Sequence, residues 1–298
     1  MNKRPKQNIH GIILLDKPIG MSSNQALQKV KWIFNAKKAG HTGSLDPLAT
    51  GLLPLCFGQA TKVSEYLLDS HKKYRTVIRL GETTDTLDSE GEVLETRPVN
   101  ITEAQIEAAL DQFRGKIKQV PPMYSALKKD GQPLYKLARK GQNIERPARD
   151  MTVHSLKATL IDKQHVELQV HCSSGFYIRS LAHDLGEVLG CGAHVVELRR
   201  TDIKSISVSD AVSIDFLESA RLEEVLQPID SLLGDMPKLE ISDEQAVSLT
   251  QGKVTPAQGL QTSELTRFYT PNKRLFGVGE VRSEGVLKTR KMFIDADS

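Results

Sequence analysis

The sequence predicts an α+β fold of strands flanked by helices, followed by a small β-rich module. Three observations predict this class. Residues 73–80 alternate polar and apolar side chains with a period of two, which is typical of a strand with one buried face. Residues 152–161 and 165–172 form two strand-like runs joined by a polar turn. Residues 102–113 open with the capping-box pair Thr102 and Gln105 and carry one apolar face, as a helix does.

The first half of the chain otherwise alternates short apolar runs with turn residues. Ser22 and Ser23 are candidate caps of a helix on which we expect Trp32 to pack. Thr, Asp and Gly dominate residues 81–91 and predict a loop. The remaining expected elements are strands over 11–15, 52–57 and 92–97 and a helix over 59–68.

The second half predicts a boundary near residue 236. A helix is expected after Tyr177 that ends at Gly190 or Gly192, and the strand 194–200 and an acidic helical region follow. Residues 232–237 are expected to be a linker. Beyond it we expect a helix over 243–250 and strands over 275–281 and 285–294. We therefore expect two domains, 1–236 and 237–298.

Composition indicates an ordinary globular protein, with 39% hydrophobic and 26% charged residues among 298. The apolar run 12–15 is too short for a signal peptide or a membrane span, so we expect a cytoplasmic protein. Cys56, Cys172 and Cys191 include no C-x-x-C pair. A metal site would require His41, His171 or His194 to meet in space, and we expect neither a metal nor a disulfide.

Charge is distributed in blocks. Residues 1–40 hold eight basic residues against one acidic residue, residues 123–149 hold seven against two, and residues 201–250 hold three against eleven. Such blocks favour one face built for a polyanion, although unrelated solvated surfaces would give the same counts. Residues 123–149 also contain Tyr124 and Tyr135, and basic residues interleaved with aromatics suit a flexible flap over nucleic acid.

The stretch Gly40-His41-Thr42-Gly43-Ser44-Leu45-Asp46-Pro47-Leu48-Ala49-Thr50-Gly51 offers one carboxylate, Asp46. Pro47 disfavours the α conformation for Asp46. Taken alone, the pair predicts a helix N-cap at Asp46 with Pro47 in the first turn. A phosphate-binding P-loop is excluded, because no G-x-x-x-x-G-K-[ST] pattern is present.

Four segments together resemble the TruB-type tRNA pseudouridine synthases over residues 10–235. The stretch around Asp46 is similar to the catalytic motif of that family. The others are Lys73-Tyr74-Arg75, Tyr177-Ile178-Arg179-Ser180 with Asp184-Leu185-Gly186, and Leu198-Arg199-Arg200. Residues 15–23 resemble the N-terminal signature of the family, and Phe176 departs from the pattern, since a small polar residue usually precedes the tyrosine.

The resemblance implies the pseudouridine synthase fold: a central mixed, largely antiparallel sheet flanked by helices, with a C-terminal module similar to PUA-type RNA-binding domains. It implies isomerisation of uridine 55 in the T loop of tRNA to pseudouridine, without cofactor, metal or guide RNA. The target base would be flipped out of its loop.

The resemblance also implies roles for individual residues. Asp46 would be the nucleophile, with attack on the base or on the sugar left open, and Arg179 its charge partner. Tyr74 would be a stacking platform and Tyr177 a second wall; Leu198 would keep water off the base, and His41 would fill the space left by the flipped nucleotide, unless it is a loop histidine satisfied by backbone. Lys17, Lys128 and Lys129 would contact the RNA backbone.

Two alternative functions are open on the sequence. One is a guide-RNA-dependent pseudouridine synthase that works within a particle, against which the basic flap argues. The other is a tRNA-binding or RNA-folding protein in which turnover is secondary. We expect a monomer, because the sequence contains no coiled-coil pattern and no apolar interface stripe.

Overall fold

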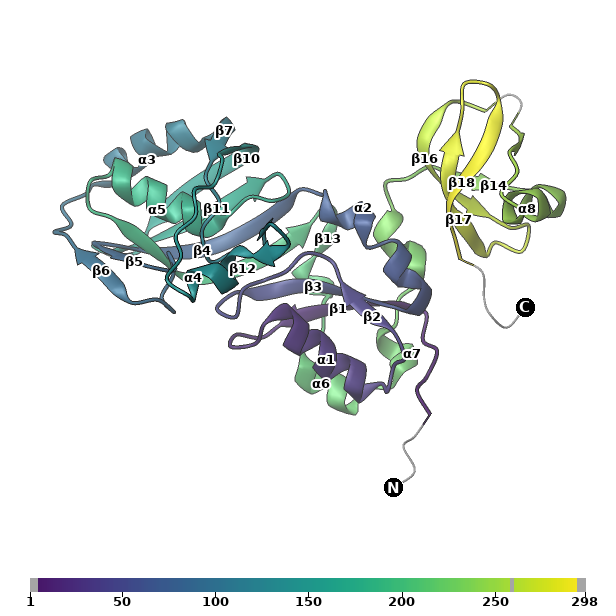
Figure 1. Ribbon diagram of the computed structural model, residues 1–298, viewed down its shortest axis with the longest axis horizontal. Helices are drawn as coiled ribbons and strands as arrows, with labels where there is room; N and C mark the ends of the chain where they lie inside the picture. Colours follow the sequence, from purple (N-terminus) through teal and green to yellow (C-terminus); the bar gives the residue numbers. More distant parts are fainter. Residues whose placement is uncertain (1–4, 258–259, 294–298) are drawn as a thin grey trace.

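The computed structural model describes residues 5–257 and 260–293, which form one large mixed sheet with helices and one small sheet (Figure 1). The expectations for residues 1–4, 258–259 and 294–298 lie outside the described residues. Within those described, no helix has the length and apolar character needed to cross a membrane.

The large sheet has the order β1-β3-β12-β4-β11-β10-β7, with β2 beside β3 and β13 beside β12. Among the described strands of this sheet, β12 and β3 pair in parallel and the other neighbours are antiparallel. The predicted mixed, largely antiparallel sheet is confirmed. Its strands are β1 Gly11–Lys17, β2 Ala39–His41, β3 Thr50–Phe57, β4 Lys72–Leu80, β7 Gly115–Gln119, β10 Arg149–Leu160, β11 His165–Cys172, β12 Ala193–Ile203 and β13 Ile206–Ser207.

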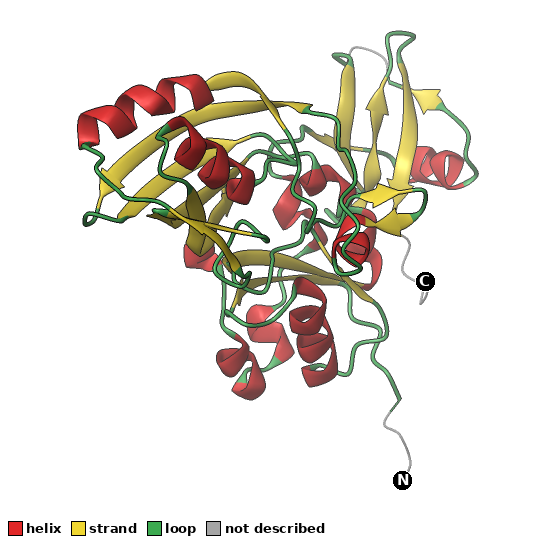
Figure 2. Cartoon of the chain, turned by 60° about the vertical axis from the view of Figure 1, so that its left-hand side comes forward, coloured by secondary structure: helices red, strands yellow, loops and turns green. Residues whose placement is uncertain are grey.

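Helices cover the sheet in two groups, which Figures 1 and 2 show at its two ends. The helices α3 and α5 contact each other near β10 and β12, whereas α1 and α6 contact each other beside β1. Capping boxes at Ser22 and Thr102 start α1 and α3, as the sequence predicts. The helices of this region are α1 Ser23–Ile33, α2 Glu65–Leu68, α3 Glu103–Leu110, α4 Leu134–Ala138, α5 Ile178–Val188, α6 Ile214–Ser219 and α7 Leu222–Val225.

The small sheet has the order β14-β16-β17-β18-β15 and packs with one helix, α8, at its side (Figure 1). The helix predicted over 243–250 is confirmed, as are two of the strands. The elements are β14 Lys238–Glu240, α8 Asp243–Thr250, β15 Thr255–Pro256, β16 Ser263–Tyr269, β17 Leu275–Val281 and β18 Val286–Met292. The sequence did not predict β14, β15 or β16.

Several local predictions are wrong. The helix expected over 59–68 is a 3-10 turn, Gly58–Lys62, followed by the single turn α2. The hydroxyl groups of Thr61 and Ser64 donate to the carbonyls three residues earlier, which competes with a regular helix. Trp32 does not pack on α1 but is 75% exposed, with the Lys29 ammonium 5.8 Å from its ring.

Two expected irregular segments are more ordered than the sequence indicates. The loop expected over 81–91 begins with β5 Glu82–Thr84, which pairs with β6 Val93–Thr96. The expected linker 232–237 places Leu232, Leu233 and Met236 in buried positions. Leu233 and Met236 pack with Val278 and other apolar side chains of the small sheet.

Candidate active site

The loop that carries Asp46 connects β2 to β3 and is fixed by contacts from the N-terminal segment. Ser23 Oγ accepts a hydrogen bond from the Leu45 amide at 2.7 Å and donates one to the Leu45 carbonyl at 3.1 Å. The Pro47 carbonyl accepts from the Gly20 amide at 2.8 Å. The structure describes this loop, and no helix starts at Pro47. Residues 46–49 form a single turn, in which the Ala49 amide donates to the Asp46 carbonyl at 3.0 Å, and β3 begins directly afterwards at Thr50.

Arg179, at the start of α5, lies between two carboxylates. Its Nη2 is 2.8 Å from Asp46 Oδ2, and its Nη1 is 3.4 Å from Asp88 Oδ2. The same two nitrogens donate to the carbonyls of Thr86 and Tyr124, at 3.0 and 2.7 Å. The Arg179 side chain is 6% exposed and that of Asp88 3%, whereas that of Asp46 is 42% exposed. Asp46 is therefore the member of this network that faces the open space.

The electrostatics of Asp46 follow from this placement. Although the carboxyl is partly exposed, the protein around it removes much of its hydration; this desolvation raises its pKa above the ordinary value, and the neighbouring charge of Asp88 raises it further. The Arg179 guanidinium opposes both effects by attraction and by hydrogen bonding. The predicted charge pair between Asp46 and Arg179 is thus present in the structure. Asp88 was missed, because an acidic residue in a Thr- and Gly-rich loop carries no signal that separates it from its neighbours.

The space in front of Asp46 is a cavity of about 320 Å³. That volume lies at the lower end of the range for small-molecule sites, about 300–1,000 Å³. Five of the predicted site residues line it together: Asp46, Tyr74, Tyr177, Arg179 and Leu198. Lys72 and Arg200 line it as well. The cavity therefore combines one carboxylate, two phenol rings, several apolar side chains and three cations.

The two tyrosines are held by different means. Tyr74, on β4, lies opposite the buried Arg200 of β12; burial raises the Tyr74 pKa, and the charge of Arg200 lowers it. Arg200 in turn donates to the carbonyls of Leu52 and Gly43, at 2.8 and 3.0 Å. Tyr177 is clamped through its backbone, which donates to and accepts from the Gln119 side chain at 2.8 and 3.0 Å.

Lys17, which was expected to contact the RNA backbone, is enclosed by the protein. Its side chain is fully buried, and its Nζ donates to the carbonyls of Pro18 and Met21 at 2.7 and 2.6 Å. Burial lowers the Lys17 pKa to about 8, against the opposing pull of Asp46. An enclosed ammonium cannot reach a phosphate group. The expected contact between Lys17 and the RNA backbone is therefore wrong in this structure. Lys17 instead holds the turn that supports the Asp46 loop.

The other predicted residues lie outside the cavity wall. His41 is on β2, half-buried, and burial together with Arg200 lowers its pKa. Its Nδ1 is buried and finds no hydrogen-bond partner among the described residues. Lys128 and Lys129 are exposed on β8 Lys128–Lys129, which pairs with β9 Gln132–Pro133 to form a hairpin within the expected flap.

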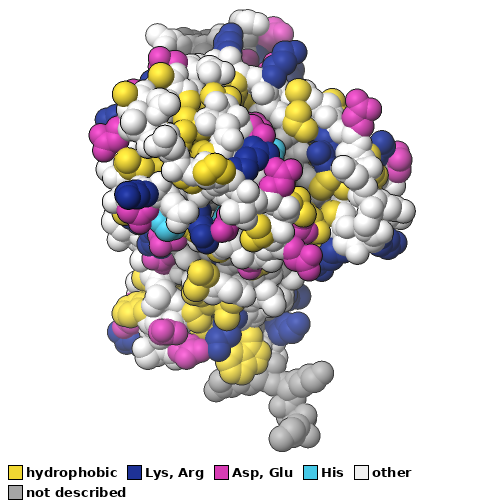
Figure 3. Space-filling model, turned by 90° about the vertical axis from the view of Figure 1, so that its left-hand side faces the viewer, with side chains coloured by type: hydrophobic (Ala, Val, Ile, Leu, Met, Phe, Trp, Pro, Cys, Tyr) yellow, Lys and Arg dark blue, Asp and Glu magenta, His cyan; other side chains and the backbone are white. Residues whose placement is uncertain are grey.

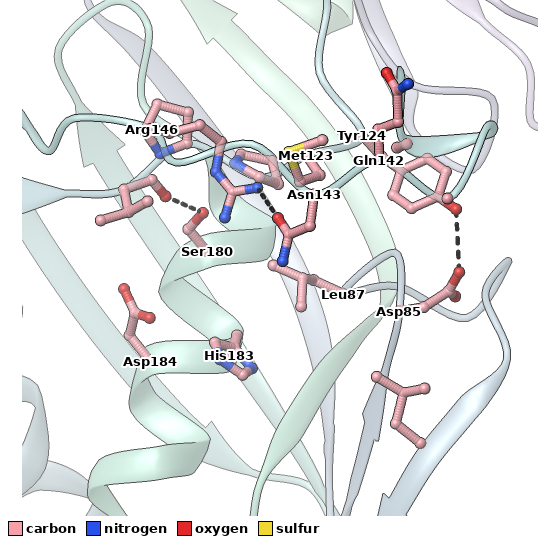
Figure 4. A pocket seen from close by; sticks show the side chains of 16 residues that line it. Asp85, Leu87, Met123, Tyr124, Gln142, Asn143, Arg146, Ser180, His183 and Asp184 are labelled. Atoms are coloured by element: carbon pink, nitrogen blue, oxygen red, sulfur yellow. Dashed lines mark hydrogen bonds between the residues drawn. The ribbon is translucent and has the colours of Figure 1, made fainter. Parts of the chain in front are cut away.

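A second cavity, of about 480 Å³, is lined by residues of the flap and of α5 (Figure 4). Tyr124 donates to Asp85 at 3.2 Å at one end of it, and Ser180 donates to the Val120 carbonyl at 2.9 Å at the other. His183 and Asp184 from α5 also line it (Figure 4). None of the residues predicted for the site lines this larger cavity, so the chemistry points to the smaller one.

The surface around these elements carries both signs of charge. On the face shown in Figure 3, Lys and Arg side chains are interspersed with Asp and Glu instead of gathering in one basic patch. The charge blocks counted along the sequence are therefore mixed on this face by the fold.

Most of the chain matches models of one protein family. Residues 31–178 match the TruB family pseudouridylate synthase N-terminal domain, and residues 179–234 match the tRNA pseudouridylate synthase B C-terminal domain. Residues 237–293 match the C-terminal domain of pseudouridine synthase II TruB.

Similar proteins include several named tRNA pseudouridine synthase B. Those from Ectopseudomonas mendocina and a Pseudomonas putida strain are 52% and 51% identical, over 97% of each chain. That from Pseudomonas aeruginosa is 50% identical over 97% of this chain and 98% of its own.

Solved structures agree with this assignment. A chain of a Cbf5-Nop10-Gar1 complex is similar with a TM-score of 0.73 and 27% identity, over 97% of this chain and 86% of that one. A chain of an H/ACA RNP bound to a substrate RNA has the same fold, with a TM-score of 0.73, 24% identity and the same coverage. From the match of sequence, fold and cavity, we conclude that this chain belongs to the TruB family of pseudouridylate synthases.

Proposed function

We propose that this chain converts uridine 55 in the T loop of tRNA to pseudouridine, as a stand-alone monomeric enzyme in the cytoplasm. One observation carries the proposal: the Asp46 carboxylate, paired with the buried Arg179 at 2.8 Å, opens into a cavity that is walled by two tyrosines. The relatives named tRNA pseudouridine synthase B, at about half identity over nearly the whole chain, support tRNA as the substrate.

The reaction breaks the bond between N1 of uracil and C1′ of the ribose and forms a bond between C5 and C1′. The C5 hydrogen leaves as a proton and N1 gains one, so the product is an isomer of the substrate and no oxidant is required. Asp46 supplies the nucleophilic carboxylate. Arg179 keeps that carboxylate ionised against the desolvation that a bound base would add.

The surrounding residues bind and orient the flipped base. The ring of Tyr74 provides a stacking face, worth about 1–3 kcal/mol for a base, and Tyr177 forms the opposite wall. Leu198 excludes water from the detached uracil. His41 fills the position that the nucleotide vacates. Domain 1–236 carries the chemistry, and domain 237–298 binds RNA outside the target loop.

The alternative functions differ in what they require. A guide-dependent enzyme needs a second RNA to present the uridine, whereas the flap of this chain offers the exposed Lys128 and Lys129 for direct contact with tRNA. A tRNA-folding protein has no need of a carboxylate paired with a buried arginine. Both features favour a stand-alone catalyst.

The test uses the purified full chain and an unmodified tRNA transcript, with no guide RNA and no other protein. We expect the T-loop uridine, and no other uridine, to be converted to pseudouridine over many turnovers. Conversion that appears only after a guide RNA or partner proteins are added would support the guide-dependent alternative. Binding of tRNA without any conversion would contradict the proposed function.

A further inference from the structure

Three histidines from separate segments meet on the large sheet, away from the catalytic cavity. They are His71, which directly precedes β4, His154 on β10 and His171 on β11. One ring nitrogen of each lies within 4.8 Å of the others, and no other group of three His, Cys, Asp or Glu side chains this close occurs among the described residues. The sequence alone offered His41 and His194 as possible co-ligands of His171, whereas the fold brings His171 to two different histidines.

Strand pairing explains why these three side chains converge. On β11, His171 lies opposite Lys73 of β4 on one side and Ser155 of β10 on the other. The register of β10 shifts between Val153 and Ser155, so His154 is an extra residue in a β-bulge. A bulge of this kind redirects a side chain. The His154 ring accordingly lies 4.4 Å from the His71 ring and 4.7 Å from the His171 ring, between centroids.

The cluster lies on the sheet face opposite to the catalytic cavity. Successive side chains of a strand point to opposite faces, and residues paired across strands share a face. Tyr74 lines the cavity, so the adjacent Lys73 and its partner His171 belong to the other face. A ligand at the histidine cluster therefore would not compete directly with the base.

The ring nitrogens of the three histidines lie near the spacing that a small metal ion requires. Imidazole nitrogens bind Zn²⁺ at about 2.0–2.1 Å, which places two ligand nitrogens of a tetrahedral site about 3.3 Å apart. His154 Nε2 and His71 Nδ1 are 2.7 Å apart, and the third nitrogen is within 4.8 Å of both. His71 and His154 are exposed and His171 is half-buried, so their side chains have room to rotate. Such rotations would bring the three nitrogen–nitrogen distances toward the tetrahedral spacing.

The protonation state also suits a metal. The contact between His154 and His71 requires one ring to donate and the other to accept, so the accepting ring is neutral. Lys73 lies opposite His171 in the strand pairing, and its Nζ is 3.8 Å from Asp202, which offsets its repulsion of an ion.

We propose that His71, His154 and His171 bind one divalent transition-metal ion of the zinc class, which fastens the segment before β4 to β10 and β11. Three neutral imidazoles suit Zn²⁺, Cu²⁺ and Ni²⁺, whereas Mg²⁺ and Ca²⁺ prefer carboxylate and carbonyl oxygens. With three protein ligands, a fourth position is left for water. Because the site exists in the folded chain and not in the unfolded one, an ion bound there raises the melting temperature.

The experiment titrates Zn²⁺ into the untagged full-length chain, treated with EDTA and then freed of chelator, by calorimetry and by thermal unfolding. We expect one Zn²⁺ per chain and a higher melting temperature with Zn²⁺. His154→Gln and His171→Gln should each weaken binding by about tenfold or more and abolish the thermal shift. The control, His165→Gln, removes a histidine from the same strand β11 outside the cluster and should bind as the parent does.

Two further measurements test whether the variants fold and which side chains bind the metal. The melting temperature of each variant without metal, compared with the parent, shows that the substituted chains fold. Cu²⁺ bound to the parent should show coupling to several nitrogens in electron paramagnetic resonance, which binding to the three cysteines would not give. Failure of the parent to bind Zn²⁺ at tens of micromolar, or equal binding by His154→Gln, His171→Gln and the parent, would overturn the proposal.

Discussion

A single guanidinium serves two carboxylates in this protein, and they differ in their access to solvent. Arg179 contacts Asp46, which faces the cavity, and Asp88, which is enclosed. The sequence predicted the first pair, since both residues belong to recognisable motifs. It could not predict the second, because only the folded β5–β6 region brings Asp88 to Arg179. We therefore propose that Asp88 is a positioning residue that acts on Asp46 through Arg179.

This arrangement predicts the pH dependence of turnover. The charge of Asp88 helps to raise the Asp46 pKa, and Asp46 must be ionised to act as a nucleophile. In Asp88→Asn the Asp46 pKa should fall, so the acid limb of the single-turnover rate profile should shift to lower pH. The plateau rate should also fall, because Arg179 loses one of its anchors.

The measurement is a single-turnover pH profile with saturating tRNA. Glu95→Gln is the matched control, because it removes an acidic charge that is paired with Arg97 outside the Arg179 network. Its profile should coincide with that of the parent. An acid limb of Asp88→Asn that stays in place or moves to higher pH would show that Asp88 does not act on Asp46.

At the scale of elements, the sequence predicted those with strong periodic or capping signals. The strand 73–80, the hairpin partners 152–161 and 165–172, and the capped helices were correct, because their pattern is local. The strands β14 and β15 were missed because they are too short to show a period, and β16 because its consecutive buried residues Thr266, Arg267 and Phe268 break the alternation. The helix expected at Pro47 failed for another reason: tertiary contacts at Ser23 and Gly20 bind the loop instead.

The flap is the element whose role is most open to test. Its hairpin turns at Asp130 and Gly131, both with positive φ, which is the geometry of a type I′ turn and presents Lys128 and Lys129 on an exposed strand. In the double variant Lys128→Gln/Lys129→Gln, tRNA binding should weaken and depend less on salt. The slope of log affinity against log salt should decrease by about 1–2, because two phosphate contacts are lost.

The double variant should keep the kcat of the parent at saturating tRNA, since neither lysine lines the cavity. Filter binding at several salt concentrations gives the slope. Lys163→Gln, in the turn between β10 and β11, is the control for loss of a positive charge outside the flap. An unchanged slope in the double variant would show that Lys128 and Lys129 do not contact the RNA phosphates.

At the scale of the whole molecule, the two sheets are joined by an apolar cluster and by polar contacts. Val63, Leu233 and Met236 pack against Val278 and Phe293. Lys62 Nζ donates to the Met292 carbonyl at 2.8 Å, and Lys291 lies 3.1 Å from Glu65. The sequence predicted only a linker at 232–237 and not this packed junction. A sequence pattern cannot show which apolar side chains of a turn-rich segment contact a distant strand.

This cluster predicts a stability effect without a catalytic one. Leu233 is 1% exposed, so Leu233→Ala should lower the free energy of unfolding by about 2–5 kcal/mol, through lost burial and a residual cavity. The kcat of the folded fraction should be unchanged. Urea denaturation measures the first quantity. Leu94→Ala, at a position 64% exposed, should change stability by no more than about 0.5 kcal/mol; equal losses in both variants would contradict a packed junction.

The central claim is that the Asp46 carboxylate performs the chemistry of uridine conversion. Its most direct test is single-turnover conversion of the T-loop uridine by Asp46→Asn, measured with tRNA affinity on the same preparation. Asn keeps the size of the side chain and removes its charge, so tRNA should bind within a few-fold of the parent, while pseudouridine formation should be lost. Pseudouridine formation by Asp46→Asn at a rate near that of the parent would contradict the claim.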